Sequence, residues 1–280
     1  MSATIIQGKT IAEALLSDLR EQVEALGAPL HLAAIVAGDD PGLRAFVRLK
    51  QKAAHTAGIQ FSTYVFDADD EAGARQTLAY LAADEQVHGI FVELPLPTGW
   101  DRAGFCALIP SEKDVDLLSS RSEQRCADGV SPILPPAALA VRTLLQALGR
   151  DVRGARVAVV GQGALIGIPV ARWFRQQGAE VIDIDVDTPQ PELLARGADI
   201  IISGAGVPGL VTDAWVKEGA LVLDFGYAKR GNAYVGDVDA ASVAKIAGAL
   251  TPVPGGMGPL VVAAVLENVL TLATRPASAG

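Results

Sequence analysis

Apolar residues are spaced along the chain in two alternating patterns, one typical of buried strands and the other of helices. His31–Ala37 and Val87–Val92 are largely apolar runs, as in parallel strands that are covered on both faces. Between such runs, apolar residues recur at helical spacing, and two of the helical segments end at glycines. The elements predicted in the first half are helices Ile11–Leu26, Leu43–Ala57 and Ala72–Ala83 and strands His31–Ala37, Phe61–Phe66 and Val87–Val92.

A proline-rich segment, Ser131–Ala137, interrupts this alternation and is the predicted domain boundary. The elements predicted after it are helix Ala138–Leu148, strand Val157–Val160, a helix that begins in Ala164–Ile168 and ends at Gln177, strand Glu180–Ile184, a short helix near Glu192, strands Asp199–Ser203 and Ala220–Asp224, and helix Leu260–Ala273. Thr251–Pro259 contains three prolines and three glycines and is predicted to be a loop. The alternation predicts an α/β fold with parallel sheets, whose ligands bind at the carboxyl ends of the strands.

Composition narrows the classes of function. The 280 residues can form two domains, and half of them are hydrophobic. A net charge of -9 without a lysine or arginine cluster argues against nucleic acid and membrane surfaces as partners. The N-terminus lacks the pattern of a secretory signal, so we expect a cytoplasmic protein. Cys106 and Cys126 stand in no metal-ligand pattern, and we expect inert thiols and no metal site.

A glycine turn is expected where strand Val157–Val160 ends. Gly161, Gly163 and Gly167 form the pattern G-x-G-x-x-x-G. In a strand–turn–helix unit, such glycines let the backbone approach a pyrophosphate, whose charge the helix N-terminus attracts. The spacing differs from the usual G-x-G-x-x-G, and a turn without a nucleotide is the alternative.

Three stretches resemble one family closely: GDDPGLRAFVRLKQKA; GIFVELPLPTGWD followed by EKDVD; and VGDV ahead of TPVPGGMGP. They are similar to the methylenetetrahydrofolate dehydrogenase/cyclohydrolase family, in its order and spacing, from Ile5 to about Leu270. The resemblance implies an α/β fold of two domains with a folate cleft between them, and usually a homodimer. The folate-binding catalytic domain would comprise residues 1–137 and 260–280, and a Rossmann-like NAD(P)-binding domain residues 138–259.

The resemblance also implies a set of site residues. The family's catalytic lysine corresponds to Lys50, which lies one helical turn after Phe46, so both side chains share a face. A lysine in an apolar cleft releases its proton more readily and can exchange protons while water attacks methenyl-tetrahydrofolate. Asp116 corresponds to the aspartate that accepts hydrogen bonds from the pterin ring. The alternatives are an exposed helix lysine and a solvated KDVD turn.

The remaining implied residues surround the substrate and the cofactor. Those expected at the substrate are Phe46, Leu94, Pro95, Pro254, Gly255 and Gly256, the last three because a loop without side chains can lie flat against it. Those expected at the cofactor are Gly161, Gln162, Gly163, Ile166, Gly167, Asp183, Asp185, Gly204 and Ala205.

This chain departs from the family inside the predicted site. Phe46 replaces a tyrosine and retains only its stacking ring, and Glu93 replaces the glutamine of VQLPLP. A carboxylate beside Lys50 would hold the proton on the ammonium and weaken Lys50 as a base. Alternatively, Glu93 acts as the base itself, or stays protonated and mimics glutamine. ILPPAA replaces the P-C-T-P motif, and Val261 replaces a threonine.

The cofactor region departs as well, because the second strand of this domain reads VIDIDVDT where many relatives carry His-Ser or an arginine. Carboxylates at Asp183 and Asp185 would accept hydrogen bonds from ribose hydroxyls and repel a 2′-phosphate. We therefore predict NAD or NADP as the cofactor, with NAD favoured. The alternative is that both aspartates face solvent at a strand end.

The resemblance implies that the protein oxidises 5,10-methylenetetrahydrofolate with NAD(P). We expect Lys50, Glu93 and Asp116 to be the catalytic residues and the hydrolysis to 10-formyltetrahydrofolate to be impaired. Two alternatives stay open: an enzyme for another one-carbon or pterin-like substrate, and a catalytically weak folate-binding protein.

Overall fold

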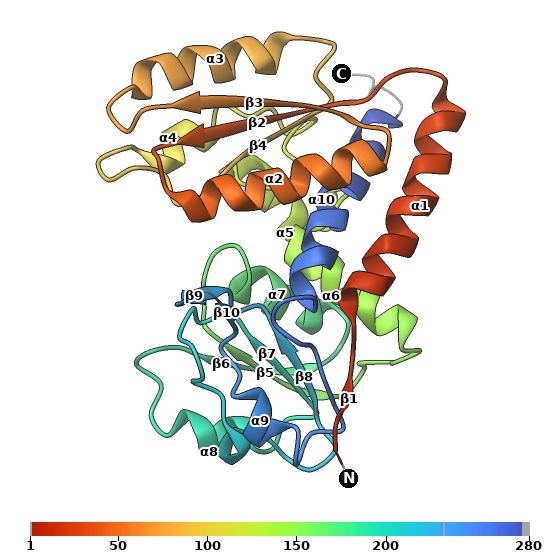
Figure 1. Cartoon of the computed structure of the whole chain (residues 1–280), viewed down its shortest axis with the longest axis vertical. Coiled ribbons are helices and arrows are strands. Elements are labelled where there is room, and N and C mark those ends of the chain that lie inside the picture. Colours follow the sequence, from red (N-terminus) through yellow and green to blue (C-terminus); the bar gives the residue numbers. More distant parts are fainter. Residues whose placement is uncertain (1, 232, 276–280) are drawn as a thin grey trace. The chain divides into compact units, whose positions relative to one another are not determined.

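The computed structural model describes residues 2–231 and 233–275. The chain divides into two compact units, each built around its own sheet (Figure 1). Unit 1 comprises Met1–Glu13 and Ala137–Val261, and unit 2 comprises Ala14–Pro136 and Val262–Gly280. Among the described residues, no helix combines the length and apolar character that a membrane span requires.

Unit 2 contains a three-stranded parallel sheet in the order β3–β2–β4. Its elements are α1 (Gly8–Leu26, from residue 14 on), β2 (His31–Ala37), α2 (Pro41–Thr56), β3 (Gln60–Phe66), α3 (Glu71–Ala83), β4 (Gly89–Val92), α4 (Arg102–Cys106), α5 (Ser120–Ala127) and the part of α10 (Met257–Ala273) that follows residue 261.

The central strand β2 is apolar from Leu32 to Ala37 because both faces of this sheet are covered. Ala33 and Ile35 pack into one core with Leu78 of α3, and Leu32 and Ala34 pack into another with α2. Figure 1 shows α3 and α2 on opposite faces of the sheet. The continuous apolar run seen in the sequence is thus the signature of a doubly covered parallel strand.

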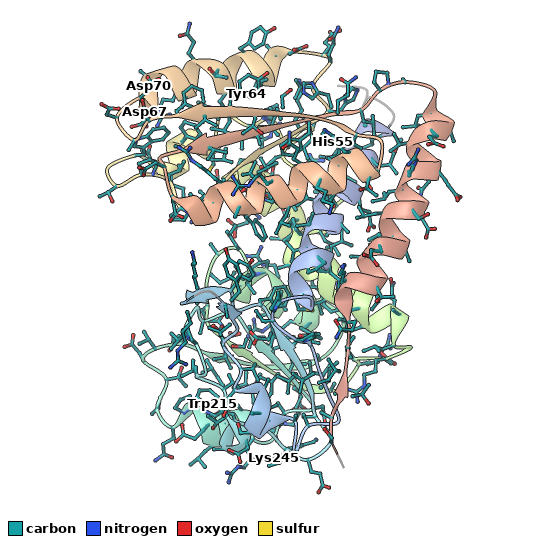
Figure 2. The ribbon with its side chains drawn as sticks, viewed as in Figure 1. His55, Tyr64, Asp67, Asp70, Trp215 and Lys245 are labelled. Atoms are coloured by element: carbon teal, nitrogen blue, oxygen red, sulfur yellow. The ribbon has the colours of Figure 1, made fainter. Side chains whose placement is uncertain are left out.

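Side-chain caps fix where several helices of unit 2 begin. Asp70, labelled with Asp67 in Figure 2, accepts a hydrogen bond from the Gly73 amide at 3.0 Å and so caps α3. Asp40 caps α2 in the same way, through the Gly42 amide at 2.6 Å. Caps of this kind satisfy amides that have no partner within the helix.

Unit 1 contains a six-stranded parallel sheet in the order β1–β11–β8–β7–β5–β6. Its elements are β1 (Thr4–Ile5), α6 (Pro136–Ala147), β5 (Arg156–Val160), α7 (Gly167–Gln176), β6 (Glu180–Ile184), α8 (Pro191–Ala195), β7 (Ile200–Ser203), η1 (Asp213–Trp215), β8 (Leu221–Asp224), β9 (Ala228–Arg230), β10 (Ala233–Val235), α9 (Ala240–Val243) and β11 (Ala249–Leu250). Trp215, labelled in Figure 2, belongs to the core on one face of this sheet.

The strand order of unit 1 reverses at β5. The chain passes from β5 to β6 on one side and then returns to β7 on the other side of β5. In doubly wound sheets, ligands bind at the carboxyl ends of the strands beside such a reversal. The turns that follow β5 and β7 are therefore the ones that a nucleotide would meet.

The predicted α/β fold is confirmed, and β2 has the predicted bounds. The helix expected to start within Ala164–Ile168 begins at Gly167, as predicted. The loop expected to reach Pro259 is wrong at its end, because α10 begins at Met257. Pro259 fits the first turn of a helix because no intrahelical partner exists there for the amide that proline lacks.

Residues 1–13 group with unit 1, whereas the resemblance assigned them to the folate-binding domain. Thr4 and Ile5 form β1, which pairs with Ala249 and Leu250 of β11 at the edge of the larger sheet. Each strand has two residues, too few to show a periodic pattern. The short elements α4, α5, β9 and β10 were missed as well.

Candidate functional site

Lys50 and Glu93 form a buried ion pair in unit 2. Lys50 lies on α2, and Glu93 directly follows β4, where its amide donates to Ile35 O at 2.9 Å and so continues the β2–β4 pairing. Lys50 Nζ lies 2.8 Å from Glu93 Oε2, and the two residues are only 5% and 6% exposed. The alternative of an exposed helix lysine is therefore wrong for Lys50.

Two aromatic rings complete the surroundings of the ammonium group. Lys50 Nζ lies 4.0 Å from the centroid of the Phe91 ring and 5.1 Å from that of Phe46. The faces of both rings attract a cation, most strongly where water is excluded. The carboxylate and the two rings together stabilise Lys50 in its charged form.

The KDVD segment, residues 113–116, runs beside β4, and its polar residues have different roles. Lys113 donates to the carbonyl oxygens of Leu81 at 3.2 Å and Asp84 at 2.6 Å. Asp114 is buried and accepts hydrogen bonds from the amides of Leu118 and Ser119, both at 2.9 Å. These two residues hold the segment in place.

Asp116 is the member of the segment that reaches the ion pair. Asp114 bridges Ile90 in parallel, which brings Asp116 level with the carboxyl end of β4, beside Glu93. Burial raises the pKa of Asp116 to about 6, Lys50 opposes this rise, and Glu93 and Asp114 add to it. Its side chain is half-buried. Asp116 is thus an acceptor with charged neighbours that solvent still reaches.

The other predicted substrate residues lie in both units. Leu94 packs against the core beneath α3, whereas Pro95 and Pro254 are exposed. Gly255 has a φ of 101°, and a Cβ on Gly256 would lie 2.4 Å from Pro252 O. Gly255 and Gly256 are therefore required by the turn itself, a reason that differs from the flat substrate surface expected from the sequence.

The glycine turn after β5 is packed tightly at two of its three glycines. Gly161 has a φ of 92°, and a Cβ there would lie 2.6 Å from Gly204 O; one on Gly167 would lie 1.8 Å from Gly161 O. Gly163 differs, since nothing lies within 4 Å of a Cβ at that position. The backbone is thus uncovered at Gly163, which fits the approach of a pyrophosphate.

The other predicted cofactor residues support the same turn. Gln162 donates from Nε2 to Val159 O at 2.9 Å. Ile166 stands at the N-cap of α7, and its side chain has no hydrogen-bond acceptor. It packs closely on Gly204, since a Cβ added to Gly204 would lie 2.7 Å from the Ile166 side chain. Ala205 and Gly204 follow β7, next to Gly161.

Asp183 and Asp185 have different surroundings. Asp183 Oδ2 forms an ion pair with Arg175 of α7. Asp185 directly follows β6, beside the turn, because Gly161 N donates to Ile184 O at 2.8 Å. Its Oδ1 accepts from Thr188 Oγ1 at 2.7 Å, and this bond lowers the pKa of Asp185. Of the two, Asp185 is the carboxylate placed at the strand end.

Two buried carboxylates, Asp224 and Asp237, were not identified as functional residues from the sequence. Asp237 stands in VGDV, the stretch used only as a family signature, and accepts from Ser203 Oγ and from two amides of the turn after β7. The signal available for finding Asp237 was its place after a hairpin, between two small or apolar residues.

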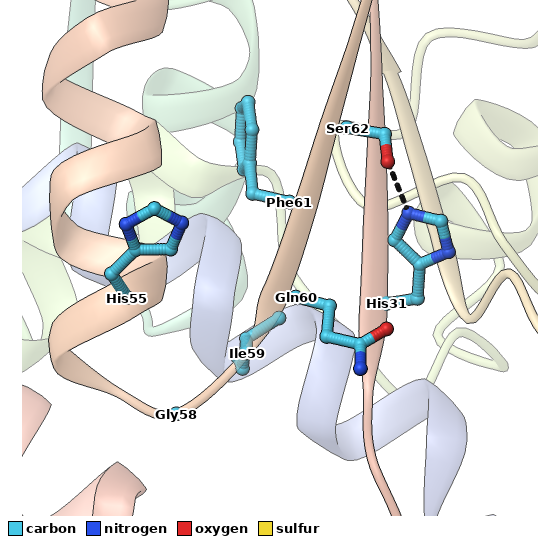
Figure 3. Close-up of a pocket in the computed structure, with 7 residues that line it drawn as sticks. All are labelled: His31, His55, Gly58, Ile59, Gln60, Phe61 and Ser62. Atoms are coloured by element: carbon cyan, nitrogen blue, oxygen red, sulfur yellow. Dashed lines mark hydrogen bonds between the residues drawn. The ribbon is translucent and has the colours of Figure 1, made fainter.

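A hollow of about 520 Å³ lies in unit 2, away from the ion pair. Figure 3 shows His55 of α2 on one side and His31 of β2 on the other, with His31 Nε2 2.8 Å from Ser62 Oγ. The hollow lies at the amino ends of β2 and β3, whereas Glu93 follows a carboxyl end. Burial lowers the pKa of His31.

Metal ligands and reactive thiols are not part of the predicted site. Among the described residues, no group of three or more His, Cys, Asp and Glu side chains is arranged to hold a metal ion. Cys106 and Cys126 are both free and buried. Burial raises the pKa of Cys106 to about 11, so this thiol stays protonated at neutral pH.

Two family models match the chain over most of its length. The tetrahydrofolate dehydrogenase/cyclohydrolase NAD(P)-binding domain matches residues 135–277, and the catalytic domain of the same name matches residues 6–116. The bifunctional protein FolD of Chloroflexus aurantiacus is 36% identical over 284 residues, covering 98% of each chain.

Solved structures show the same similarity. The bifunctional enzyme FolD from Campylobacter jejuni has a TM-score of 0.93 at 32% identity, covering 97% of this chain and 99% of its own. The Trypanosoma brucei enzyme, solved with NADP and an inhibitor, has a TM-score of 0.92 at 34% identity, covering 97% of each chain. The NAD-dependent dehydrogenase from Saccharomyces cerevisiae is 20% identical and shares the fold.

Proposed function

The chain belongs to the tetrahydrofolate dehydrogenase/cyclohydrolase family, and we propose that it oxidises 5,10-methylenetetrahydrofolate to 5,10-methenyltetrahydrofolate. In the same proposal, the protein hydrolyses this product only weakly. Similarity over the whole chain favours this function over the two alternatives, another one-carbon or pterin-like substrate and a weak folate-binding protein. The observation that separates the two steps is the buried contact between Lys50 Nζ and Glu93 Oε2.

Oxidation and hydrolysis require different help from the protein. Oxidation of the N–CH2–N bridge removes a hydride and leaves a cationic N=CH–N group, so no proton has to be taken up by a side chain. In hydrolysis, water adds to that carbon and must lose a proton, which calls for a base. Lys50 Nζ is engaged by Glu93 Oε2 at 2.8 Å and is therefore less available to the attacking water, so hydrolysis is the step that the pair weakens.

Among the three roles considered for Glu93, the 2.8 Å contact supports the ion pair. A glutamic acid that only mimics glutamine would leave Lys50 charged and without a counterion in a buried place, which is costly. Asp116 would accept hydrogen bonds from the pterin N–H groups. With a pKa of about 6, it is mostly ionised at neutral pH and is able to do so.

The nicotinamide cofactor accepts the hydride when it is bound. In unit 1, the residues that would hold it are the turn Gly161–Gly163, Ile166 and Gly167 at the start of α7, and Gly204 and Ala205 after β7. Their fit to a dinucleotide rests on the uncovered backbone at Gly163 and on the reversal of strand order at β5.

NAD is the proposed cofactor rather than NADP, with Asp185 as the residue that accepts hydrogen bonds from the ribose hydroxyls. The carboxylate directly follows β6 and stays ionised, since its hydrogen bond with Thr188 lowers its pKa. A charge of the same sign repels a 2′-phosphate. Asp183 has Arg175 as its partner and supports this role less well.

Initial rates test the proposed function. The purified protein receives 5,10-methylenetetrahydrofolate with NAD or with NADP, and absorbance is followed at the nicotinamide and methenyl bands. We expect faster reduction of NAD and accumulation of the methenyl product. Absence of reduction with both nucleotides would overturn the dehydrogenase function, and faster reduction of NADP would overturn the cofactor preference.

A second assay isolates hydrolysis. Methenyltetrahydrofolate is added without nucleotide, and its disappearance is compared with that caused by a bifunctional relative, such as the 36% identical one from Chloroflexus aurantiacus. Equal turnover by the two enzymes would refute weak hydrolysis. The resemblance further supports a homodimer, which light scattering would test.

A further inference from the structure

The two turns beside the reversal of strand order are held together at backbone level. A Cβ on Gly161, in the turn after β5, would lie 2.6 Å from Gly204 O and 2.7 Å from the Ala205 amide nitrogen. Any displacement of the turn after β7 therefore changes the space around Gly161. The position of the turn after β7 therefore depends on the contacts that hold it.

Asp237 supplies the fixing contacts. Its Oδ2 accepts hydrogen bonds from Ala205 N at 2.7 Å, Gly206 N at 3.1 Å and Ser203 Oγ at 3.1 Å. The side chain lies 34 residues further along the chain than Ser203 and has no exposed surface. Charged acceptors bind amides more strongly than neutral ones, and three donors on one oxygen leave the turn little freedom.

Asp224 holds Asp237 in turn. Its Oδ1 accepts from the Asp237 amide at 3.1 Å and from the Gly226 amide at 2.8 Å, and its Oδ2 accepts from the Val238 amide at 3.0 Å. Asp224 ends β8, the neighbour of β7 in the sheet. The two carboxylates thus connect the turn after β8, the VGDV stretch and the turn after β7.

This arrangement tolerates no additional atoms. A Cβ on Gly236 would lie 1.9 Å from Asp224 Oδ2, and a Cβ on Gly226 would lie 2.3 Å from Asp237 N. Both glycines are therefore required by the contacts of the two carboxylates. Their spacing from the aspartates, one residue before Asp237 and two after Asp224, follows from this packing.

The arrangement is costly for stability. Two carboxylates lie close together at 4% and 0% exposure, and Asp237 Oδ1 has no hydrogen-bond partner among the described residues. Burial raises the pKa of Asp224 to about 6, and the charge of Asp237 adds to the rise. Apolar residues of similar volume often replace buried charges without loss of stability, so packing alone does not explain this pair.

We propose that Asp237 is a positioning residue for the dinucleotide, acting through the Ala205 and Gly206 amides to hold the turn after β7 at the distance from Gly161 that the bound nucleotide requires. This inference rests on the proposed function only in that the protein binds NAD or NADP. A purely structural role would change the stability of unit 1 without changing nucleotide affinity in the folded protein.

Binding of NAD to the full chain, measured by isothermal titration calorimetry without folate, tests the proposal. Asp237→Asn retains the size of the side chain and weakens its three hydrogen bonds by removing the charge. Ser203→Ala removes one of the three, and Asp239→Asn changes a half-buried aspartate two residues away that caps α9. The melting temperature and the steady-state constants are measured for each variant.

We expect Asp237→Asn to raise the Kd and the KM for NAD about tenfold, while kcat at saturating NAD and the melting temperature change little, since charge-assisted bonds become neutral ones. Ser203→Ala should raise the Kd about threefold, in proportion to the single bond lost. Asp239→Asn should leave the Kd unchanged.

Three results would overturn the proposal: an unchanged Kd in Asp237→Asn, a lower melting temperature as the sole effect, or an equal rise of the Kd in Asp239→Asn. If Asp237→Asn does not fold, Ser203→Ala decides, and an unchanged Kd in that variant refutes the role. Wild-type protein that binds neither nucleotide would instead refute the proposed function, and NADP replaces NAD throughout if it binds more tightly.

Discussion

Two carboxyl groups, one in each unit, share the same pKa of about 6 and have unlike surroundings. Burial is the main cause of the rise in both Asp116 and Asp224. Beyond burial, Asp116 responds to the charges of Lys50, Glu93 and Asp114, whereas three backbone amides oppose the rise in Asp224. Asp116 is half-buried and Asp224 only 4% exposed.

A shifted pKa therefore does not by itself identify a reactive group. Charged side chains can be rearranged by a ligand or a substitution, so the ionisation of Asp116 is adjustable and accessible to a substrate. Amides at fixed positions in the backbone bind Asp224 in one geometry that no ligand reaches. Asp116 is therefore suited to a role in the reaction, and Asp224 to holding the backbone in one conformation.

The largest expected effect comes from removing the cation of unit 2. Lys50→Met leaves Glu93 buried without its partner and should lower the free energy of unfolding by about 4 kcal/mol, as when other buried pairs lose one member. Urea denaturation at neutral pH measures this. Lys52→Met, at an exposed position of the same helix, should cost less than about 0.5 kcal/mol.

The double variant Lys50→Met/Glu93→Gln sharpens this result. With both charges removed, most of the lost stability should return, since no unpaired charge stays buried. Additive losses in the double variant would show that the two side chains contribute through packing alone.

A slightly smaller effect is expected from Asp224 as the pH changes. Its pKa is about 6 in the folded protein, against 3.8 for an unperturbed aspartate, so the folded state binds the proton more tightly. Asp224 therefore favours folding below about pH 4, and this contribution is lost as the pH rises toward 6. The loss should amount to roughly 3 kcal/mol between pH 4 and pH 7.

Asp224→Asn removes this ionisation. The difference in unfolding free energy between wild type and variant should shift by that amount across the interval, while Asp239→Asn should follow the wild type. Because Asp116 is present in all three proteins, its own ionisation cancels. A pH-independent difference would contradict the assignment of the raised pKa to Asp224.

The third effect concerns the chemistry of the ion pair. Glu93→Gln frees Lys50 from its counterion and should accelerate hydrolysis of methenyltetrahydrofolate at least about tenfold, with oxidation changed less. Removing the Glu93 charge should also lower the pKa of Asp116, because that charge contributes to its rise. The pH profile of folate binding would report this second change.

A different result would assign Glu93 another role. If Glu93→Gln slowed hydrolysis instead, Glu93 itself would be the base. Glu123→Gln, an acidic residue of α5, serves as the matched control and should leave hydrolysis unchanged.

The smallest effect is expected at Asp185, an exposed carboxylate whose pKa is lowered by its hydrogen bond with Thr188. Asp185→Asn should raise the KM for NAD about fivefold by weakening its hydrogen bonds to the ribose, and should reduce the preference for NAD over NADP. Asp183→Asn should do neither, since Asp183 pairs with Arg175. Equal effects at both positions would contradict the distinction between them.

Much of the fold was predictable because apolar periodicity records local burial. β2 was predicted with its observed bounds, since a strand covered on both faces is apolar over nearly its whole length. The strands β1 and β11 were not, because two residues carry no period and their pairing joins positions about 245 residues apart.

The candidate site was likewise predictable only in part. The resemblance named Lys50, Glu93 and Asp116, and helical spacing alone put Phe46 and Lys50 on one face. Lys50 and Glu93 are 43 positions apart in the sequence, and nothing between them indicates that they meet at 2.8 Å, which depends on the packing of α2 against the sheet. The ion pair of Asp183 with Arg175 likewise depends on where α7 lies.

The α/β class, most of the longer helices and strands, the glycine turn and the family could be inferred from the sequence. Tertiary structure alone decided that residues 1–13 join unit 1, that Lys50 is paired, and that Asp224 and Asp237 connect three turns. The physical reason is the distance along the chain over which each kind of signal acts. Hydrophobic period and turn chemistry act within a few residues, whereas the ionisation and the role of a buried group depend on neighbours that only the folded chain brings to it.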